Sequence, residues 1–319
     1  MLCEPISVPI FKRLRSDART PRLCQLENEI SYITVRMKGG LGNQLFQYAT
    51  ARALSLHHGV PLKLDVSDVQ TSGPMAFCLD ALLADYDVAT QPQIAPRAST
   101  SPSPYKRIRR AARNSILYWT GSRPKRIEQV GHGYDPHLLR HRPPVYLDGY
   151  WQTEKYFVRY AETIRSDIRL PSPAGAVWPN EVDATPISVH VRRGDYVGNA
   201  MHPCCTPQYY EQAAAHLAAQ YDAEPVFLVF SDDLAWVKDN IELPYQVMYM
   251  NEQGENRNYE DMALMSLCKA HIIANSSFSW WGAWLNPDPA KKVVAPAQWF
   301  GNVATRELDI LPEEWIVLP

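Results

Sequence analysis

Short apolar runs alternate with helical patterns along the first half of the chain. Residues 33–37 are rich in apolar side chains and predict a strand, and the apolar positions within residues 44–58 recur at helical spacing. Gly59 stands where the C-terminal cap of that helix belongs, and residues 61–66 predict a second strand. A strand, a helix and a strand in this order form a β-α-β unit, which indicates a parallel sheet.

The second half repeats this alternation after a proline-rich stretch at residues 170–186, which we interpret as a linker between domains. We predict strands at residues 187–191, 226–230, 246–249, 271–274 and near Val293, and helices at residues 207–221, 233–240 and 259–269. The predicted fold class is therefore α/β, with two Rossmann-like domains. Their predicted limits are residues 31–175 and 186–319, and a chain of 319 residues is long enough for both.

Composition narrows the classes of function. With 46% hydrophobic residues and a net charge of -2, the chain resembles neither a disordered protein nor a polyanion binder, so we expect no nucleic acid partner. The six cysteines include no C-x-x-C pair, which argues against a disulfide framework and against a zinc site. No run is long and apolar enough to span a membrane, and the N-terminus shows no signal-peptide core. We therefore expect a cytoplasmic protein without a metal site.

Two basic stretches stand outside the predicted domains' regular pattern. Residues 1–30 place basic side chains between prolines without periodicity, and we expect a mobile extension. Its contact with anionic lipid, and so a peripheral association at the inner face of the membrane, is an open alternative. Residues 106–126 predict a surface insertion that either receives an anionic acceptor or forms a solvated helical face.

The sequence HVRRGDY, residues 190–196, carries the strongest chemical signal. Arg192 and Arg193 follow a predicted strand, at the edge where open α/β sheets bind ligands. A guanidinium binds phosphate oxygens in bidentate fashion and stays charged at any working pH, so the pair predicts a diphosphate site. Because adjacent residues at a strand end point to opposite sides, we expect one arginine to bind phosphate and the other to orient Asp195 or a loop. The alternative is an arginine pair held in salt bridges at a domain interface.

Two neighbouring strand ends add polar side chains. Ser231 and Asp232 follow the strand at residues 226–230, and we expect Asp232 to recognise a nucleoside and Asp233 to cap a helix. A helix is expected to start after residues 271–274, and its free backbone N–H groups suit it to binding phosphate or sugar. The residues at this helix start are Asn275, Ser276, Ser277 and Phe278. Trp281 and Trp284 lie three residues apart on that helix, which favours a role as core anchors.

The loop with Gly40 and Gly42 lies between a strand and a helix, where glycine lets a backbone approach a phosphate. As a dinucleotide fingerprint it lacks the third glycine, because Leu45 occupies that position, although Asp65 lies where a ribose-binding acid belongs. A dinucleotide site and a tight turn without a ligand both stay open as alternatives. The D-x-D sequence at residues 85–87 is too short to indicate a metal site by itself.

Taken in order, GGLGNQLFQYA, LDGYWQTEKYF, HVRRGDY, FSDD and NYEDMALMSLCKAHIIANSSFSWWGAWLN resemble the bacterial α1,2-fucosyltransferases over roughly residues 33–299. The resemblance implies a GT-B-like fold, in which two Rossmann-like domains face a cleft, with the donor in the C-terminal domain and the acceptor side in the N-terminal domain. It implies inverting transfer of fucose from GDP-fucose to a galactose hydroxyl of an oligosaccharide or glycan repeat unit. Neither a metal nor another cofactor is implied.

The resemblance also assigns roles to individual residues. Arg192 would contact the donor diphosphate, with His190 beside it and Arg193 in support, while Asp232 would read the nucleoside. The other donor-binding positions would be Ser231, Gly40, Gly42, Asn43, Asn275, Ser276, Ser277 and Phe278. Of these, Asn43 would face the reaction centre across the cleft. For the acceptor, we expect contacts from Tyr150 and Gln152.

The base for the acceptor hydroxyl is the open part of this mechanism. Asp195 is the first candidate, because a carboxylate can take the proton, although the neighbouring arginines weaken it as a base. His190, Glu154 and Asp148 stay open, as does a dissociative transition state that needs no base. Two other functions are alternatives: an NAD(P)-dependent sugar-nucleotide oxidoreductase that uses the glycine loop, and a non-catalytic nucleotide-sugar-binding module.

Overall fold

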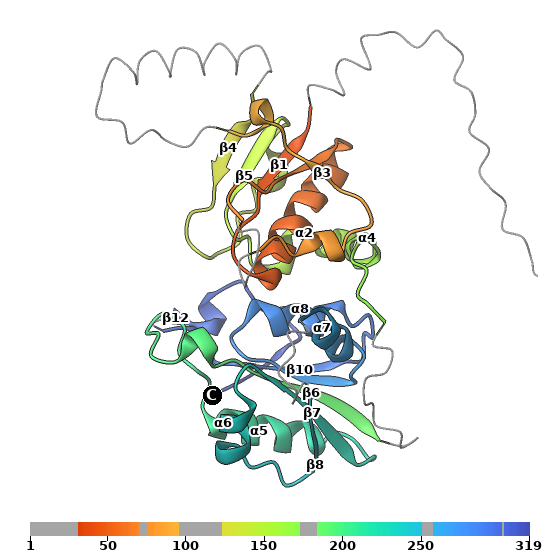
Figure 1. Ribbon diagram of the computed structural model, residues 1–319, viewed down its shortest axis with the longest axis vertical. Helices are drawn as coiled ribbons and strands as arrows, with labels where there is room; N and C mark the ends of the chain where they lie inside the picture. Colours follow the sequence, from red (N-terminus) through yellow and green to blue (C-terminus); the bar gives the residue numbers. More distant parts are fainter. Residues whose placement is uncertain (1–30, 70–75, 96–122, 173–183, 251–257, 302) are drawn as a thin grey trace, which may run out of the picture.

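Two parallel sheets, one from each half of the chain, form the framework of the protein (Figure 1). The computed structural model describes residues 31–69, 76–95, 123–172, 184–250, 258–301 and 303–319. The N-terminal sheet has the strand order β3-β2-β1-β5-β4, from β1 (Ile33–Arg36), β2 (Leu62–Asp65), β3 (Asp87–Val88), β4 (Lys125–Glu128) and β5 (Val145–Asp148). The C-terminal sheet has the order β13-β10-β9-β6-β7-β8, from β6 (Thr185–Val191), β7 (Pro225–Ser231), β8 (Gln246–Tyr249), β9 (Ala270–Ile272), β10 (Lys292–Pro296) and β13 (Ile316–Leu318).

Helices connect and cover these strands. The α-helices are α2 (Leu41–His58), α4 (Ala161–Asp167), α5 (Pro207–Ala218), α6 (Leu234–Asn240), α7 (Asn258–Ser266) and α8 (Ser277–Leu285). An antiparallel pair, β11 (Gln298–Phe300) and β12 (Val303–Ala304), follows the C-terminal sheet strand β10. Single 3-10 turns are η1 (Leu79–Ala81), η2 (Gln91–Gln93), η3 (Leu138–Arg140), η4 (Glu154–Tyr156), η5 (Val158–Tyr160), η6 (Gly194–Tyr196) and η7 (Thr305–Glu307). Within the described ranges, none of the helices has the length and apolar character that crossing a membrane requires.

The strand and helix predictions are confirmed where the hydrophobic pattern was clear. The first β-α-β unit is β1, α2 and β2, with β1 and β2 parallel, and Gly59 caps α2 at a φ of 66°. In the second half, each predicted strand and helix is present within a few residues of its predicted limits. The prediction missed strands β3, β4, β5, β11, β12 and β13 and helix α4. Strand β4 has the sequence KRIE and lies at the edge of its sheet, where Lys125 and Glu128 are exposed and Arg126 forms ion pairs, so no hydrophobic pattern marks it.

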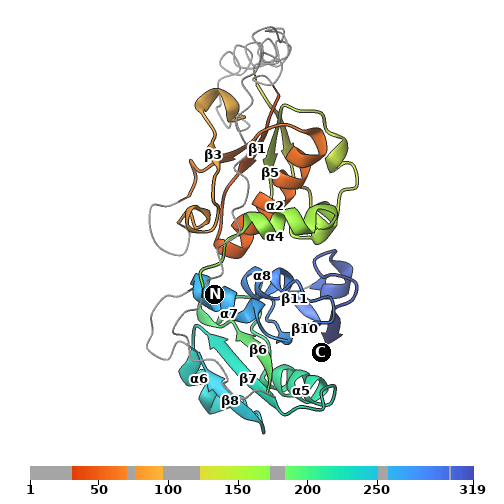
Figure 2. The same ribbon diagram turned by 90° about the vertical axis from the view of Figure 1, so that its right-hand side faces the viewer.

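A single hydrophobic cluster joins the two halves. In both views α2 and α4 of the N-terminal half lie next to α7 and α8 of the C-terminal half (Figures 1 and 2). Phe46 of α2 lies 4.4 Å from Trp280 of α8 between ring centroids, and Phe157 stacks on Trp281 at 5.6 Å. Trp281 and Trp284 are buried, so their role as core anchors is confirmed.

The predicted domain limits, residues 31–175 and 186–319, stay a prediction, since the shared cluster contains side chains from both sheets' helices. The expected N-terminal extension, residues 1–30, lies outside the described residues. So does most of the basic stretch at residues 106–126, of which the structure describes only residues 123–126.

Candidate functional site

The site begins at the carboxyl end of β6, where the strand turns into η6. The apolar side chains of Val189 and Val191 point into the core, and His190 between them is also buried. The His190 ring lies 5.4 Å from the ring of Phe278 at the start of α8, so two of the predicted strand ends converge here. Tyr196 reinforces this junction by donating its hydroxyl hydrogen to the carbonyl oxygen of Asn275, at 3.3 Å.

Arg192 lies between two carboxylates at this strand end. Its Nη2 is 2.6 Å from Oδ1 of Asp195, and its Nη1 is 2.9 Å from Oδ2 of Asp232. The side chain of Arg192 is 35% exposed and that of Asp195 is 64% exposed, so solvent reaches this ion pair. Both sides of the Arg192 guanidinium are therefore engaged by carboxylates, which are partners of the kind that a phosphate can replace.

Arg193 points to different partners, as expected of adjacent residues at a strand end. Its Nε donates to Oδ2 of Asp233 at 3.0 Å, and its guanidinium lies 3.6 Å from the ring centroid of Trp236. The backbone N–H of Arg193 donates to Oδ1 of Asp232 at 2.8 Å. Arg193 therefore fixes the β7 end, and its backbone orients the carboxylate that Arg192 contacts.

The β7 end confirms the expected helix cap. Oδ1 of Asp233 accepts the backbone N–H of Trp236 at 3.2 Å, so Asp233 is the N-cap of α6. The hydroxyl of Ser231 accepts the N–H of Asp233 at 3.0 Å and stabilises the same turn. Ser231 thus makes a local contact with the turn.

The start of α8 combines partly exposed side chains with polar groups that already have hydrogen-bond partners. Ser276 is the N-cap and accepts the N–H of Phe278 at 3.3 Å, while Ser277 and Phe278 are only partly buried. Asn275 is 1% exposed, and its Nδ2 donates at 3.0 Å to two carbonyl oxygens, those of Pro203 and Trp299. Both amide hydrogens of Asn275 are thus used to tie two loops to the helix start, and its direct contact with the donor stays a prediction.

The start of α2 meets the start of α8 almost backbone to backbone. A Cβ atom on Gly42 would lie 2.5 Å from the carbonyl carbon of Ser277 and 2.7 Å from the backbone nitrogen of Phe278. Gly42 is therefore needed for a close approach of two helices, and its place beside the donor phosphate stays a prediction. Gly40 is the N-cap of α2, and its carbonyl oxygen accepts the N–H of Gln44.

In the first turn of α2, Asn43 meets one of the two predicted acceptor-binding residues. Oδ1 of Asn43 accepts a hydrogen bond from Nε2 of Gln152 at 2.7 Å. Tyr150, two residues earlier, is 41% exposed, and the Lys38 ammonium lies 4.7 Å from its ring centroid. The two loops that follow β1 and β5 therefore meet beside the helix junction.

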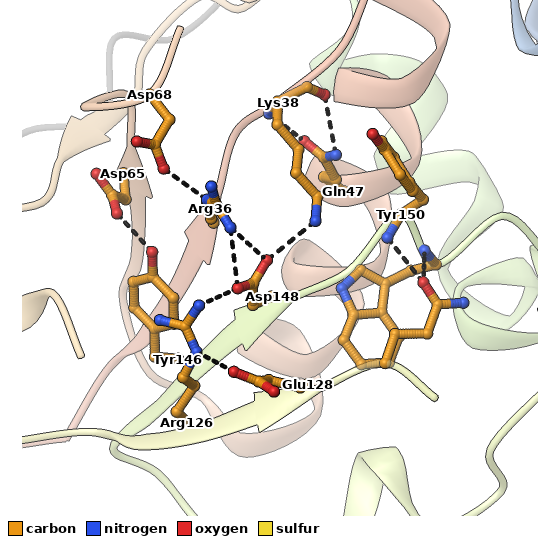
Figure 3. A network of polar contacts seen from close by, with 12 residues as sticks. Arg36, Lys38, Gln47, Asp65, Asp68, Arg126, Glu128, Tyr146, Asp148 and Tyr150 are labelled. Carbon is orange, nitrogen blue, oxygen red and sulfur yellow. Dashed lines mark hydrogen bonds and ion pairs between the residues drawn. The ribbon is translucent and has the colours of Figure 1, made fainter. Parts of the chain in front are cut away.

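These two loops are anchored by a buried carboxylate. Asp148 accepts hydrogen bonds from Arg36 at 3.1 Å, from Lys38 at 3.0 Å and from Arg126, so three cations from different segments surround it (Figure 3). Burial alone would raise the pKa of Asp148, but the Lys38 hydrogen bond and the three positive charges outweigh it and lower the pKa. Asp148 is thus a stable anion and a poor proton acceptor.

The other proposed bases differ in environment. Burial, with a smaller contribution from Arg192, lowers the pKa of His190 to about 3, so this imidazole is neutral at physiological pH. Its Nδ1 is buried and has no hydrogen-bond partner in the described part of the chain. Glu154 has a raised pKa through burial, but its Oε2 accepts the indole N–H of Trp284 near the other end of α8, away from the Arg192 ion pairs. Asp195 is the exposed carboxylate beside Arg192.

The alternatives that used the N-terminal half do not fit its geometry. Asp65 is 2% exposed and accepts the hydroxyl hydrogen of Tyr146 at 2.5 Å, so it is not available to a ribose. Of the D-x-D sequence, Asp87 forms an ion pair with Lys63 at 2.6 Å on the edge strand β3. Across the described ranges, His, Cys, Asp and Glu side chains form no group of three or more that could hold a metal ion.

Sequence reasoning missed an aromatic row beside Arg192. The Arg192 guanidinium lies 5.6 Å from the Tyr196 ring, and Tyr196 stacks on His202 at 5.1 Å. Next along the row is Phe300, 5.4 Å from His202 and 4.6 Å from His132. Tyr196 and His202 belong to one segment, whereas Phe300 of β11 and His132 lie far from it in the chain, so no local pattern could have revealed the row.

Comparison with known proteins decides the family. The model described as Glycosyl transferase family 11 matches residues 137–318, which is more than half of the chain. The chain belongs to this glycosyltransferase family. It is 32% identical over 307 residues to an alpha-1,2-colitosyltransferase of Escherichia coli, covering 90% of this chain and 99% of that protein. Family 11 membership makes the protein a glycosyltransferase, so the oxidoreductase and the non-catalytic module are wrong.

More distant relatives of this family 11 protein include enzymes from animals. It is 28% identical over 278 residues to galactoside alpha-(1,2)-fucosyltransferase 1 of Alouatta caraya, covering 79% of this chain and 64% of that protein, so it spans just under two thirds of that relative's length. Among solved structures, NodZ alpha-1,6-fucosyltransferase soaked with GDP-fucose matches with a TM-score of 0.47 and 16% identity, covering 81% of this chain and 93% of that one.

Proposed function

We propose that this protein transfers fucose from GDP-fucose to the 2-hydroxyl of a galactose in an oligosaccharide or glycan repeat unit, with inversion at the anomeric carbon. Family 11 membership and the galactoside fucosyltransferase among its relatives support this activity. The structural observation that carries it is Arg192, which is held at a strand end between exposed carboxylates and beside the junction of two helix starts. Peripheral membrane association and a cytoplasmic location stay predictions.

In the proposed mechanism, the donor diphosphate replaces the carboxylates of Asp195 and Asp232 on Arg192. Ser277, at the partly exposed start of α8, then offers its backbone N–H group and its hydroxyl to the phosphates, with the Phe278 side chain beside it. His190 stays neutral beneath them, so it adds no charge to the site. Arg193 acts indirectly, because it orients Asp232 and braces the β7 end.

The chemical step is one displacement. The acceptor oxygen bonds to the anomeric carbon as the bond from that carbon to the diphosphate oxygen breaks, and the electron pair stays on the diphosphate. The fixed guanidinium of Arg192 neutralises this developing charge, and donors of this kind typically contribute about 10²-fold to 10³-fold in rate. Once released from Arg192, Asp195 can take the acceptor proton, and the proposal keeps it as the candidate base.

The test compares Arg192→Ala with the wild type and with Arg159→Ala, which removes an exposed arginine elsewhere. With GDP-fucose and lactose we expect Arg192→Ala to lower kcat by about 10²-fold or more, whereas Arg159→Ala keeps wild-type activity. GDP should raise the Tm of the wild type in the presence of EDTA, because the proposed site needs no metal. A kcat in Arg192→Ala within a factor of three of the wild type would refute the assigned role.

A second donor is favoured by one specific comparison. The relative that this chain matches over 99% of the relative's length is an alpha-1,2-colitosyltransferase. Colitose is fucose without its 3-hydroxyl. Competition between GDP-fucose and GDP-colitose at equal concentrations, with product linkage determined by NMR, separates the two donors. A product that contains only colitose would refute fucose as the donor sugar while leaving the roles of Arg192 and Asp232 intact.

A further inference from the structure

Helix α8 meets the N-terminal half of the protein at both of its ends. At its start, Gly42 of α2 lies against the backbone of Ser277. Near its end lies Trp284, which is 2% exposed. Two residues of the N-terminal half bind Trp284 there, Glu154 of η4 and Arg165 of α4. In Figure 2, α4 accordingly lies next to α8. The helix that carries the proposed donor-binding residues at its start is thus held at its far end as well.

Trp284 is bound through both its ring and its backbone. Its indole N–H donates to Oε2 of Glu154 at 2.9 Å. Its carbonyl oxygen accepts hydrogen bonds from Nε of Arg165 at 3.2 Å and from Nη2 of Arg165 at 3.1 Å. The Arg165 guanidinium also lies 4.2 Å from the centroid of the Trp284 ring, a distance typical of a cation–π interaction. Because the last carbonyl groups of a helix have no partner within the helix, and a cation is favourable at this end, Arg165 completes the end of α8.

Glu154 is a partly buried carboxyl group that the proposed mechanism does not use. Burial raises its pKa and the charge of Glu314 adds to the rise, while the Trp284 hydrogen bond and the charges of Lys291 and Arg165 oppose it. A raised pKa is typical of a general base, but a base has to lie within about 3.2 Å of the acceptor hydroxyl or reach it through one water. Helix α8 has nine residues, which places its two ends about 12 Å apart. Glu154 therefore lies too far from the helix start to take the proton.

The middle of α8 is packed in the hydrophobic cluster that both halves share. Trp280 lies 4.4 Å from Phe46 between ring centroids, and Trp281 stacks on Phe157 at 5.6 Å. Each end of the helix is about 6 Å from this packed middle, so a tilt of about 5° moves each end by about 0.5 Å. Since a displacement of about 1 Å between reacting groups lowers the rate by about 10²-fold, a shift of half that size corresponds to about 10-fold. Contacts at one end of α8 therefore bear on the chemistry at the other.

We propose that Glu154 and Arg165 are positioning residues, which fix the end of α8 through Trp284 and thereby set the place of the helix start relative to the N-terminal half. In this role Glu154 is a hydrogen-bond acceptor, and it exchanges no proton during the reaction. The proposal rests on the proposed function, because the donor diphosphate is expected at the helix start. It deepens that function by excluding Glu154 as the base for the acceptor hydroxyl.

Glu154→Gln separates a positioning role from a base. The glutamine side chain has nearly the same shape and still accepts the indole N–H of Trp284, but it takes up no proton at working pH. We expect Glu154→Gln to keep kcat within about twofold of the wild type and to leave the dependence of kcat on pH unchanged. Glu154→Leu offers no acceptor and should lower kcat by about 10-fold, while the KM of donor and acceptor stay within about threefold.

Arg165→Met repeats the test at the second contact. Methionine still packs on the Trp284 ring but donates nothing to the carbonyl oxygen, so kcat should again fall by about 10-fold. Arg169→Met is the matched control, because it changes an exposed arginine just beyond α4, and it should keep the wild-type kcat. The Tm of each variant shows that folded protein is assayed. If Glu154→Leu does not fold, Glu154→Gln and Arg165→Met decide the question.

Two results would overturn the proposal. One is a loss of kcat in Glu154→Gln as large as the loss in Glu154→Leu, since the charge of Glu154 would then matter and its acceptor oxygen would not. The other is a wild-type kcat in folded Glu154→Leu and Arg165→Met. The assay uses the donor that the wild type accepts. Failure of GDP-fucose as that donor refutes the proposed donor sugar, whereas the ratios of kcat among the variants decide on the positioning role.

Discussion

Replacing Gly42 by alanine tests whether the contact between α2 and α8 controls catalysis. The added Cβ would lie 2.5 Å from the carbonyl carbon of Ser277, 2.6 Å from its oxygen and 2.7 Å from the nitrogen of Phe278. All three are backbone atoms, so no side-chain rotation can relieve the clash. The helix starts must separate by about 1 Å to reach ordinary van der Waals distance.

The separation has two measurable consequences. Overpacking of this kind destabilises a folded protein by about 1–3 kcal/mol, partly offset by the higher helix propensity of alanine, which amounts to at most about 1 kcal/mol. The effect on catalysis is larger, since a displacement of 1 Å between reacting groups lowers the rate by about 10²-fold. We therefore expect Gly42→Ala to lose far more activity than its loss of stability explains.

Urea unfolding and steady-state kinetics with GDP-fucose and lactose measure the two effects. Gly133→Ala is the matched control, because a Cβ there would lie 3.7 Å from Oδ2 of Asp309, an ordinary contact. The control should retain wild-type stability and activity. The reasoning fails if Gly42→Ala keeps a kcat within threefold of the wild type while remaining fully folded, since the helix contact would then have no bearing on the reaction.

Two further predictions concern buried ionisable groups. Asp148→Asn leaves Arg36, Lys38 and Arg126 without their shared anion and should lower the free energy of unfolding by about 3 kcal/mol at pH 7. Because the folded pKa of Asp148 is lowered, this difference should persist above about pH 4 and shrink as the pH falls further, which urea titrations at several pH values would show. A difference that stays constant down to pH 2 would contradict this assignment. His190 and His271 both have a pKa of about 3 through burial, so unfolding becomes easier as the pH falls from about 6.5, by up to about 1.4 kcal/mol per pH unit for each. His271→Gln should reduce that slope, and an unaltered slope would show that other groups cause it.

Local chemistry explains what could be predicted from the sequence. The strand at β1, the helix α2 and its cap Gly59 follow from hydrophobic spacing and from the need for a left-handed residue at the helix end. Asp233 caps α6 through contacts within three residues of itself. Arg192 and Arg193 have different partners because adjacent side chains at a strand end diverge. Each of these features depends on neighbours in the sequence.

Tertiary structure alone decided how the predicted residues divide their roles. Gly42 resembled a phosphate-binding glycine, but its neighbour is the backbone of Ser277, more than two hundred residues away. Asn275 resembled a ligand-binding residue, but its amide group donates hydrogen bonds to carbonyl oxygens of two loops. The aromatic row from Tyr196 to His132 joins segments from both halves, and no periodic pattern in the sequence predicts it. The sequence by itself therefore determined which chemical groups stand at the strand ends. Only packing between distant segments determined which of those groups remain available to a substrate.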